Sequence, residues 1–411
     1  MPKIAIVAGE ASGDLLGSHL IQALKAQRSD LTFIGIAGPK MIAQGAKSLF
    51  SIEKLSVRGY VEVLKHLYGL LRLRKNLFKQ LLAEKPAVFI GVDAPDFNFW
   101  LERKFKKQNI PAVHYVSPSI WAWRGGRMGK IKRAVSHVLA LFPFEPALYD
   151  AAGVPVTYVG HPLADELPLE PNTHTARVTL KLKQDVLVVA MLPGSRQSEV
   201  KQHAALFVKT AHIMTADYKK AQSQGFTLES LDLKGVALDG VVLKDTIFKE
   251  VKFLVPLITR ETRDIFQHAL HQSFVDYPDV ELDLQILFGH AHDAMEAADI
   301  VIVASGTATL EAALLKKPMV ITYRMPTLSW WILKRMRYQV FVGLPNILAG
   351  KFLVPELLQN EATSQNLADA AKRLLSDSHY LQEIKQEFTK IHISLKQNAA
   401  QKAAAVILAY L

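Results

Sequence analysis

The chain of 411 residues contains no cysteine. Disulfide bonds and thiolate metal ligands are therefore excluded, and nothing in the composition favours an oxidising compartment. The chain also lacks an apolar run of the roughly 18 to 20 residues that a membrane-spanning helix needs. Its N-terminus is a strand followed by a polar loop, without the pattern of a signal peptide. We therefore expect a cytoplasmic protein.

Positive charge, in contrast, is in excess. Lysine and arginine number 49 against 38 aspartate and glutamate residues, so the formal net charge is +11. This balance favours an anionic partner: nucleic acid, a phosphorylated substrate or an anionic lipid surface. RNA-binding signatures are absent. Segments 60–82 and 328–341 mix basic residues with Trp, Tyr and Leu, which suits lipid headgroups. Alternatively, their apolar residues pack inward and the basic ones form a solvated face.

The length suggests two domains, and half of the residues are apolar, enough for large cores. Strand-like and helix-like segments alternate, which predicts an α/β fold of doubly wound parallel sheets. Strands are predicted at 3–8, 32–37, 88–92, 112–116 and 135–142, with a polar loop at 9–14, and again at 186–192, 252–256, 285–288, 300–304 and before Tyr323. We predict two Rossmann-like domains facing a central cleft, at 1–165 and 174–340, and a helical segment at 341–411 that packs back across them.

The segment 298–323 combines a buried strand, a loop of small residues, a helix and a second strand. The helix begins with the small residues Ser305, Gly306 and Thr307, so no bulky side chain covers its free N–H groups. A phosphate can therefore bind at the positive end of the helix dipole. Glu311, just over one turn inside, is well placed to accept hydrogen bonds from a ribose diol. Alternatively, Ser305 only caps the helix and Glu311 only favours its dipole.

Other polar residues also follow predicted strands, at the edge where α/β proteins bind ligands. In the first half these are Glu10, Ser12 and Gly13, then Asp93 and Asp96, then the block HYVSPSIWAWR from His114 to Arg124. In the second half, Ser195 and Arg196 follow a strand in the segment LPGSR. Both halves thus carry candidate chemistry at strand ends.

Several short motifs occur in order over nearly the whole chain. They are GEASGD at Gly9, AGP at Ala37, GVDAPDFN at Gly91, HYVSPSIWAWR at His114, FPFE at Phe142, VGHPLAD at Val159, LPGSR at Leu192, SGTATLE at Ser305 and LPNILAG at Leu344. Together they resemble the lipid-A-disaccharide synthase family, and HYVSPSIWAWR is highly specific. The resemblance implies a GT-B inverting glycosyltransferase, independent of metal and without a cofactor. It would join UDP-2,3-diacylglucosamine to 2,3-diacylglucosamine 1-phosphate and release UDP.

The resemblance also implies partners and site residues. The partners are the two substrates and the cytoplasmic face of an anionic inner membrane, and the sequence leaves a homodimer open. The reaction needs a base for the proton of the acceptor 6-hydroxyl. Asp93 is the first choice and by resemblance the family's essential aspartate; Asp96 and Glu10 are the substitutes, and an Asx turn is the alternative role of Asp96. Arg196 and the N–H groups after Ser305 would stabilise the leaving diphosphate.

The remaining candidates would bind substrate. Glu311 would hold the ribose and Asn346 would line the same cleft. His114, Ser117 and Arg124 would shape the acceptor side, although a satisfied core histidine is the preferred interpretation of His114 alone. The other candidates are Ser12, Gly13, Asp96, Ser195, Ser305, Gly306 and Thr307, and no metal site is predicted. Two rival functions stay open: a UDP-sugar epimerase of the same architecture and a non-catalytic lipid-sugar binding protein.

Residues 224–250 depart from the family pattern as a long insertion. Apolar residues recur there at every fifth position, at Leu228, Leu233, Leu238, Leu243 and Phe248. This period fits neither a helix nor a strand. It predicts a short pentapeptide-repeat coil that needs a neighbour for stability, the alternative being an irregular loop.

Overall fold

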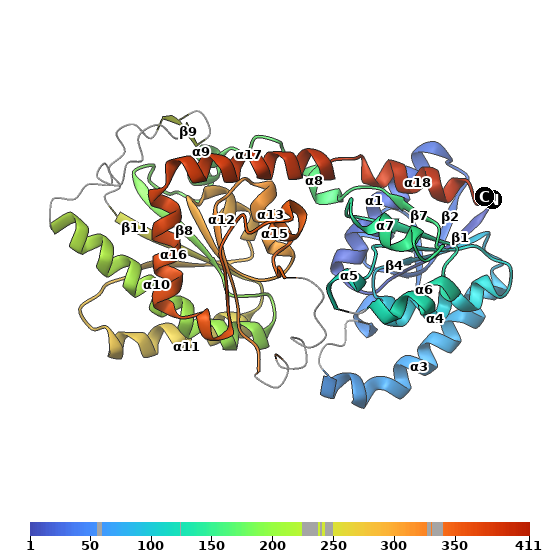
Figure 1. Cartoon of the computed structure of the whole chain (residues 1–411). Helices are drawn as coiled ribbons and strands as arrows, with labels where there is room; N and C mark the ends of the chain where they lie inside the picture. Colours follow the sequence, from blue (N-terminus) through green and yellow to red (C-terminus); the bar gives the residue numbers. More distant parts are fainter. Residues whose placement is uncertain are drawn as a thin grey trace. The chain divides into compact units, whose positions relative to one another are not determined.

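The computed structural model describes residues 1–55, 60–123, 125–223, 237–238, 241–242, 250–326, 330 and 340–411. The chain divides into two compact units, one of Met1–Glu166 with Ser394–Leu411 and one of Leu167–Ile393. Each unit is built on its own parallel sheet with helices on both faces (Figure 1). The predicted α/β class with two Rossmann-like domains is confirmed.

The first sheet has seven strands in the order β3-β2-β1-β4-β5-β6-β7, and neighbouring strands pair in parallel. Their bounds are β1 Lys3–Ala8, β2 Thr32–Ala37, β3 Ala46–Ser51, β4 Val88–Val92, β5 Ala112–Tyr115, β6 His137–Ala140 and β7 Val156–Tyr158. The chain builds outward from β1 in one direction and then restarts at β4 in the other. The loops after β1 and β4 therefore meet where the strand order reverses, the point at which open α/β sheets bind ligands.

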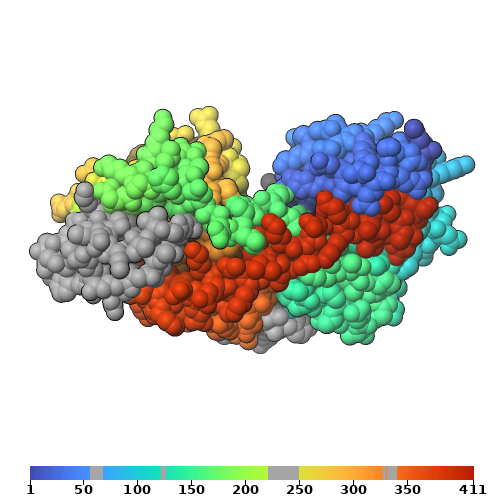
Figure 2. All heavy atoms as spheres, turned by 90° about the horizontal axis from the view of Figure 1, so that it is seen from above, coloured from blue at the N-terminus to red at the C-terminus, as the bar shows by residue number. Residues whose placement is uncertain are grey.

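Helices cover both faces of this sheet. Their bounds are α1 Ala11–Gln27, α2 Pro39–Ala43, α3 Tyr60–Ala83, α4 Pro95–Lys106, α5 Ile120–Trp123, α6 Met128–Ala134, α7 Glu145–Asp150, α8 Pro162–Glu166 and α18 Ala399–Leu408, with short 3-10 turns η1 Ile52–Lys54 and η2 Gly125–Arg127. Apolar residues of α1 and α18 share one core with the sheet, and those of α3 and α4 share a second core on the opposite face. Figure 2 shows α18 (red) on the surface of this unit beside α1 (blue).

The second sheet has six parallel strands in the order β12-β11-β8-β13-β14-β15. Their bounds are β8 Val186–Leu192, β11 Glu250–Leu257, β12 Asp283–Phe288, β13 Ile300–Ala304, β14 Met319–Tyr323 and β15 Glu356–Leu358. The strand order reverses between β8 and β13, just as it does between β1 and β4. The loops after β8 and β13 are therefore the expected ligand-binding loops of this unit.

The second unit is also covered by helices. Their bounds are α9 Thr173–Thr179, α10 Gln197–Ser223, α11 Arg260–Asp276, α12 Ala291–Ala297, α13 Thr307–Leu314, α15 Leu344–Ala349, α16 Ser364–Ser376 and α17 Ser378–Leu395, with the 3-10 turn η4 Gln359–Glu361. Helix α17 begins in this unit, and its last residues belong to the first unit. None of the described helices is long and apolar enough to cross a membrane.

Some predicted elements need correction. The segment 9–14 is not all loop, because α1 begins at Ala11 and places Ser12 and Gly13 in its first turn. The segment 341–411 is not purely helical, since β15 adds an edge strand to the second sheet. Strand β6 covers only His137–Ala140 of the predicted 135–142, and β3 and β7 were not predicted. These edge strands are less apolar than the central ones, so their sequence signal is weaker.

The segment 224–250 is described only in part. Strands β9 (Ala237–Leu238) and β10 (Val241–Val242) pair antiparallel, and Glu250 begins β11. The rest of the predicted pentapeptide coil lies outside the described residues.

Candidate active site

The turn after β4 holds Asp93 and Ala94 in a left-handed backbone conformation, with φ of 51° and 43°. This region is unfavourable for residues with a Cβ, on the order of 1–3 kcal/mol each. Three features hold the turn: the Asp93 N–H donates to the Tyr115 carbonyl at 2.8 Å, the Asn98 Nδ2 donates to the Asp93 carbonyl at 2.8 Å, and Pro95 begins α4. No described residue makes a hydrogen bond or ion pair with the partly buried Asp93 carboxylate.

Two glycines bring the loop after β1 against this turn. A Cβ at Gly9 would lie 2.5 Å from the Cβ of Ala94, and a Cβ at Gly13 would lie 3.5 Å from the Val92 carbonyl oxygen. Glu10, between them, is the partly buried N-cap residue of α1. Glu10 and Asp93 therefore belong to two loops in contact at the carboxyl edge of the first sheet, whereas Ser12 is exposed on the first turn of α1.

The aspartate of the GEASGD motif has an internal role. Asp14 is buried, and its carboxylate accepts hydrogen bonds from the N–H groups of Gly38 at 2.9 Å, Lys40 at 3.0 Å and Met41 at 3.0 Å. A Cβ at Gly38 would lie 2.4 Å from Asp14 Oδ2. The side chain thus caps the N-terminus of α2, which stabilises that helix and explains the glycine of the AGP motif.

A buried ionisable pair lies behind the Asp93 turn. His114 Nδ1 and Glu102 Oε1 are 2.6 Å apart, and both side chains are fully buried. A Cβ at Gly91 would lie 2.2 Å from Glu102 Oε1, so only glycine leaves room for the pair. Burial raises the pKa of Glu102, and His114 opposes this shift. Glu102 was not predicted, although its i,i+4 spacing from Asn98 places both polar residues on one face of α4.

Two residues predicted to bind substrate in the first unit, Ser117 and Asp96, have partners within the protein. Ser117 is buried, and its Oγ lies 2.8 Å from the Tyr149 hydroxyl, so this oxygen is engaged inside the protein. The Asp96 side chain is 80% exposed and pairs with Arg127 at 3.1 Å; no Asx turn is formed by it in the described structure. Arg124 lies outside the described residues.

The loop after β8 wraps around Glu199 in the first turn of α10. Glu199 Oε2 accepts hydrogen bonds from the N–H groups of Ser195 at 3.0 Å and Arg196 at 3.2 Å. The Arg196 Nη1 lies 3.5 Å from Glu199 Oε1, and the Arg196 side chain remains 56% exposed. The backbone of the loop is therefore fixed, while the guanidinium is open to an anion from solvent. Glu199 was not predicted, although an acid three to four residues after a strand-end loop is a common helix-start signal.

The loop after β13 leaves an open space at the start of α13. Gly306 is the N-cap residue, with φ of 138°, and apart from its own chain neighbours and helix backbone no described atom lies within 4 Å of the position of a Cβ there. The Ser305 N–H donates to the Thr322 carbonyl at 3.0 Å, which ties the loop to the end of β14. Gly306 and Thr307 are exposed. The unpaired N–H groups of a first helical turn in such a position can bind an anion.

Glu311 of α13 pairs with a histidine of the neighbouring helix α12. Its Oε1 lies 3.2 Å from His292 Nδ1, and its side chain is 24% exposed. The hydrogen bond to Glu311 raises the pKa of His292. His292 was not predicted, because no local motif connects residues of two successive βα units.

Asn346 does not fit its predicted contact with substrate. It is fully buried, and its Nδ2 donates to the Val354 carbonyl at 2.8 Å and to Glu356 Oε1 at 2.9 Å. Its Oδ1 accepts hydrogen bonds from the N–H groups of Leu353 at 2.8 Å and Val354 at 2.9 Å. The side chain is saturated and shapes the loop before β15.

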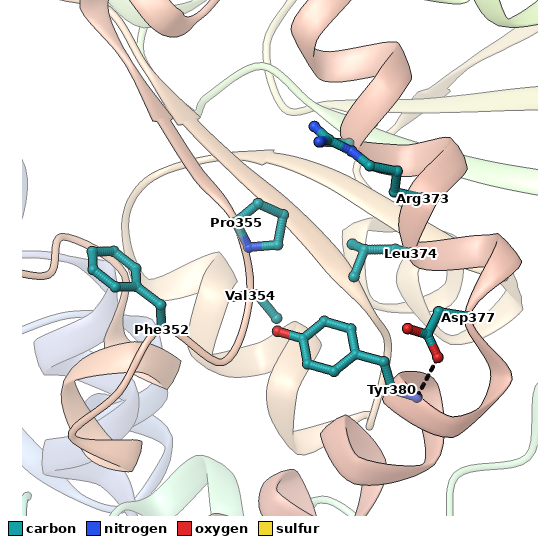
Figure 3. Close-up of a pocket in the computed structure, with 8 residues that line it drawn as sticks. Phe352, Val354, Pro355, Arg373, Leu374, Asp377 and Tyr380 are labelled. Carbon is teal, nitrogen blue, oxygen red and sulfur yellow. Dashed lines mark hydrogen bonds between the residues drawn. The ribbon is translucent and has the colours of Figure 1, made fainter.

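A cavity of about 360 Å³ lies elsewhere in the second unit. Figure 3 shows its lining, in which Tyr380, Leu374 and Asp377 from α16 and the start of α17 face Val354 and Pro355 just before β15. In a parallel sheet the residues before a strand lie at the amino edge. The cavity is therefore at the opposite edge from Arg196 and Ser305, and it belongs to neither set of strand-end loops. Within the described ranges no group of three His, Asp or Glu residues can hold a metal ion.

Two Rossmann-like units, each with a parallel sheet whose strand order reverses once, define the GT-B fold. Among solved structures, UDP-GlcNAc 2-epimerase from Neisseria meningitidis bound to UDP-GlcNAc matches with a TM-score of 0.57 at 12% identity, covering 99% of this chain and 98% of that one. At this identity the likeness concerns the fold alone.

Sequence comparison identifies the family. The family model "Lipid-A-disaccharide synthetase" matches residues 4–231 and 238–410. The lipid-A-disaccharide synthase of Methylobacillus flagellatus is 59% identical over 411 residues, covering 100% of both chains. That of an Azoarcus species is 52% identical over 410 residues, covering 100% of this chain and 96% of its own. The chain belongs to the lipid-A-disaccharide synthetase family and is a glycosyltransferase of lipid A biosynthesis.

The matched ranges also correct the view of the segment 224–250. Within this segment only residues 232–237 fall outside the family model, and the Methylobacillus flagellatus relative is matched over its whole length. Most of the segment is thus shared with relatives, so the expected departure from the family pattern is much shorter than predicted.

Proposed function

We propose that the chain joins UDP-2,3-diacylglucosamine to the 6-hydroxyl of 2,3-diacylglucosamine 1-phosphate, with the carboxyl edge of the first sheet binding the acceptor and that of the second binding the donor. The acceptor oxygen attacks the anomeric carbon, the bond from that carbon to the diphosphate oxygen breaks, and UDP leaves with the electron pair. The acceptor proton passes to a base of the first sheet, so atoms and charges balance.

Asp93 is the proposed base. The observation that carries the proposal is the strained turn at Asp93 and Ala94, which is held by Asn98 and Tyr115 while the carboxylate has no partner among the described residues. Strained backbone of this kind persists where the surrounding structure fixes a functional group. Glu10, on the touching loop after β1, is the nearest substitute, while Asp96 is already paired with Arg127.

The leaving diphosphate is proposed to bind between Arg196 and the start of α13. Arg196 supplies an exposed guanidinium on a fixed backbone, and Gly306 keeps the first turn of α13 open. Fixed donors aimed at developing negative charge stabilise a transition state strongly, because they need no reorganisation during the reaction. Glu311 is proposed to accept the ribose hydroxyls, with His292 holding its carboxylate in place.

Acylated substrates reside in a membrane surface, so we also propose peripheral binding to anionic membranes on the cytoplasmic side. Helix α3 supports this in the described structure. Its Leu77 and Leu81 are buried in the core, whereas Tyr68, Arg72, Lys75 and Lys79, at helical spacing, are exposed along one face. We call these four residues the basic face of α3. The second predicted patch, 328–341, lies almost entirely outside the described residues.

The direct test is an assay of the purified protein with both proposed substrates, monitoring the disaccharide and UDP together. Equal amounts of the two products are expected. Incubation with the UDP-sugar alone is the control: conversion of the sugar without acceptor would indicate an epimerase, and binding of both lipids without turnover would indicate a non-catalytic protein.

A further inference from the structure

A fully buried histidine connects two strand-end segments of the second sheet. His203, in α10, has its Nδ1 3.1 Å from the Pro193 carbonyl oxygen, in the loop after β8. Its Nε2 accepts a hydrogen bond from the Arg324 N–H at 2.9 Å, just after β14. Because a backbone N–H can only donate, the neutral ring carries its proton on Nδ1 and donates it to Pro193. Burial lowers the pKa of His203, which favours this neutral form.

The residue after Arg324 is fixed as well. The Met325 N–H donates to Gln359 Oε1 at 2.8 Å, and Gln359 Nε2 donates to the Met325 carbonyl at 3.1 Å. Two side chains from separate elements, His203 and Gln359, therefore hold the backbone of residues 324–325.

The Arg324 side chain, by contrast, is free in the described structure. It is partly exposed, and among the described residues the hydrogen bond given for Arg324 is that of its backbone N–H, with none from its guanidinium and no ion pair. The segment that follows, 327–339, contains no Asp or Glu. A fixed backbone with an unpaired guanidinium at a ligand-binding edge is the arrangement expected of an arginine that binds an external anion.

Arg324 is also close to the other proposed anion-binding groups. Arg324 comes two residues after Thr322, whose carbonyl accepts the Ser305 N–H at 3.0 Å. Burial and Glu199 raise the pKa of the Tyr323 hydroxyl and Arg196 lowers it, so the end of β14 is within electrostatic reach of the loop after β8. Arg196, the start of α13 and Arg324 thus follow three neighbouring strands, β8, β13 and β14, at the same carboxyl edge.

We propose that Arg324 is a second diphosphate-binding residue for UDP and the UDP-sugar, with His203 as its positioning residue. The inference rests on the proposed function in one respect, namely that the nucleotide diphosphate binds at this edge. It adds the cation that follows β14 to the one that follows β8, so that arginines from two different strand-end segments contact the diphosphate.

The test compares equilibrium binding of UDP and uridine, because only UDP carries the diphosphate. Arg324→Ala should weaken UDP about tenfold or more, since a hydrogen bond to a charged group contributes roughly 1.5–3 kcal/mol, and it should change uridine less than about twofold. Arg373→Ala, at an exposed arginine on α16, is the matched control and should change neither. His203→Phe keeps a ring without hydrogen bonds and should reproduce much of the UDP loss, whereas His203→Gln keeps an acceptor for the Arg324 N–H and should restore it.

The outcomes separate the two hypotheses. If the wild-type protein binds UDP no better than uridine, the proposed diphosphate site itself is wrong. If it prefers UDP and Arg324→Ala keeps that preference, or loses UDP and uridine equally, the role of Arg324 is refuted while the proposed function stands. If Arg324→Ala loses UDP selectively and His203→Phe does not, His203 is not the positioning residue. Because the Arg324 side chain is not buried, its replacement leaves no core cavity.

Discussion

The strand order reverses once in each sheet, but the loops at the two reversal points carry side chains of opposite charge. At the first sheet, the touching loops after β1 and β4 carry Glu10 and Asp93. At the second, the loops after β8 and β13 bring together Arg196 and the open start of α13. We propose that the first edge removes a proton and that the second binds an anion. The strand order therefore determines where a site forms, and the loop residues determine its chemistry.

The loops also differ in how the backbone is arranged. At the first sheet, two residues with side chains occupy left-handed conformations, and the strain is held by Asn98 and Tyr115. At the second, the left-handed φ angles fall on Gly194 and Gly306, which adopt them without strain. Glycine lets the backbone N–H groups approach an anion closely. At position 93 a glycine would relieve the strain but would remove the carboxylate that we propose as the base.

The first prediction removes the acidic chemistry of the first edge. Asp93→Asn should fold normally and lose turnover by on the order of 10² to 10⁴-fold, because an amide of the same shape cannot accept the hydroxyl proton. Steady-state turnover with both substrates measures it, and Asp150→Asn, at an exposed aspartate of the same unit, is the control. Retention of more than about a tenth of the turnover would assign the base role to Glu10 or Asp96.

The second prediction removes a cation of the second edge. Arg196→Ala should lower turnover by on the order of 10² to 10³-fold, as loss of a fixed donor to the leaving group typically does. Exhaustive chelation should leave wild-type turnover unchanged, and added magnesium should not rescue the variant. Turnover that disappears with EDTA and returns with magnesium or manganese would contradict a leaving group stabilised by protein donors.

The sequence predicts this comparison well where the signal is local. The apolar runs at 88–92 and 300–304 indicate buried parallel strands, and the polar residues that follow them identify both edges. The sequence cannot predict pairings between distant residues. Asp14 caps a helix that begins at Pro39, and His203 bonds to Arg324, and neither relation leaves a periodic pattern in the chain.

Motif membership also does not separate ligand contacts from internal hydrogen bonds. Asn346 and Ser117 lie in recognisable motifs and were assigned to substrate, yet Asn346 is saturated by the loop before β15 and Ser117 faces Tyr149. In a sequence, a polar residue that contacts substrate cannot be distinguished from one that makes internal hydrogen bonds. Only burial and partner geometry distinguish the two.

The third prediction concerns the proposed membrane surface, which lies on the first unit alone in the described chain. Replacing Arg72, Lys75 and Lys79 with Gln should weaken binding to anionic vesicles by on the order of 100-fold at low salt, since each basic residue contributes roughly 1 kcal/mol near anionic headgroups. Vesicle co-sedimentation measures this binding, which should weaken as salt rises.

The control is a second triple variant of equal charge change. It replaces with Gln three exposed lysines scattered over the same unit, Lys40, Lys107 and Lys130. Equal losses in both triple variants would show that net charge, not the basic face of α3, causes binding.

The last prediction should have the smallest effect on chemistry. Residues 224–249 connect α10 to β11, and β11 begins with Glu250 at the amino edge of the second sheet, opposite Arg196 and Ser305. Replacing them with a short Gly/Ser linker should therefore lower stability or solubility but leave the turnover of the folded fraction within about twofold, a change of less than about 0.5 kcal/mol in the barrier. Thermal unfolding and active-site titration with UDP would separate the two effects. A folded but inactive protein would show that the segment takes part in substrate binding. The second site would then consist of this segment together with the loops after β8 and β13.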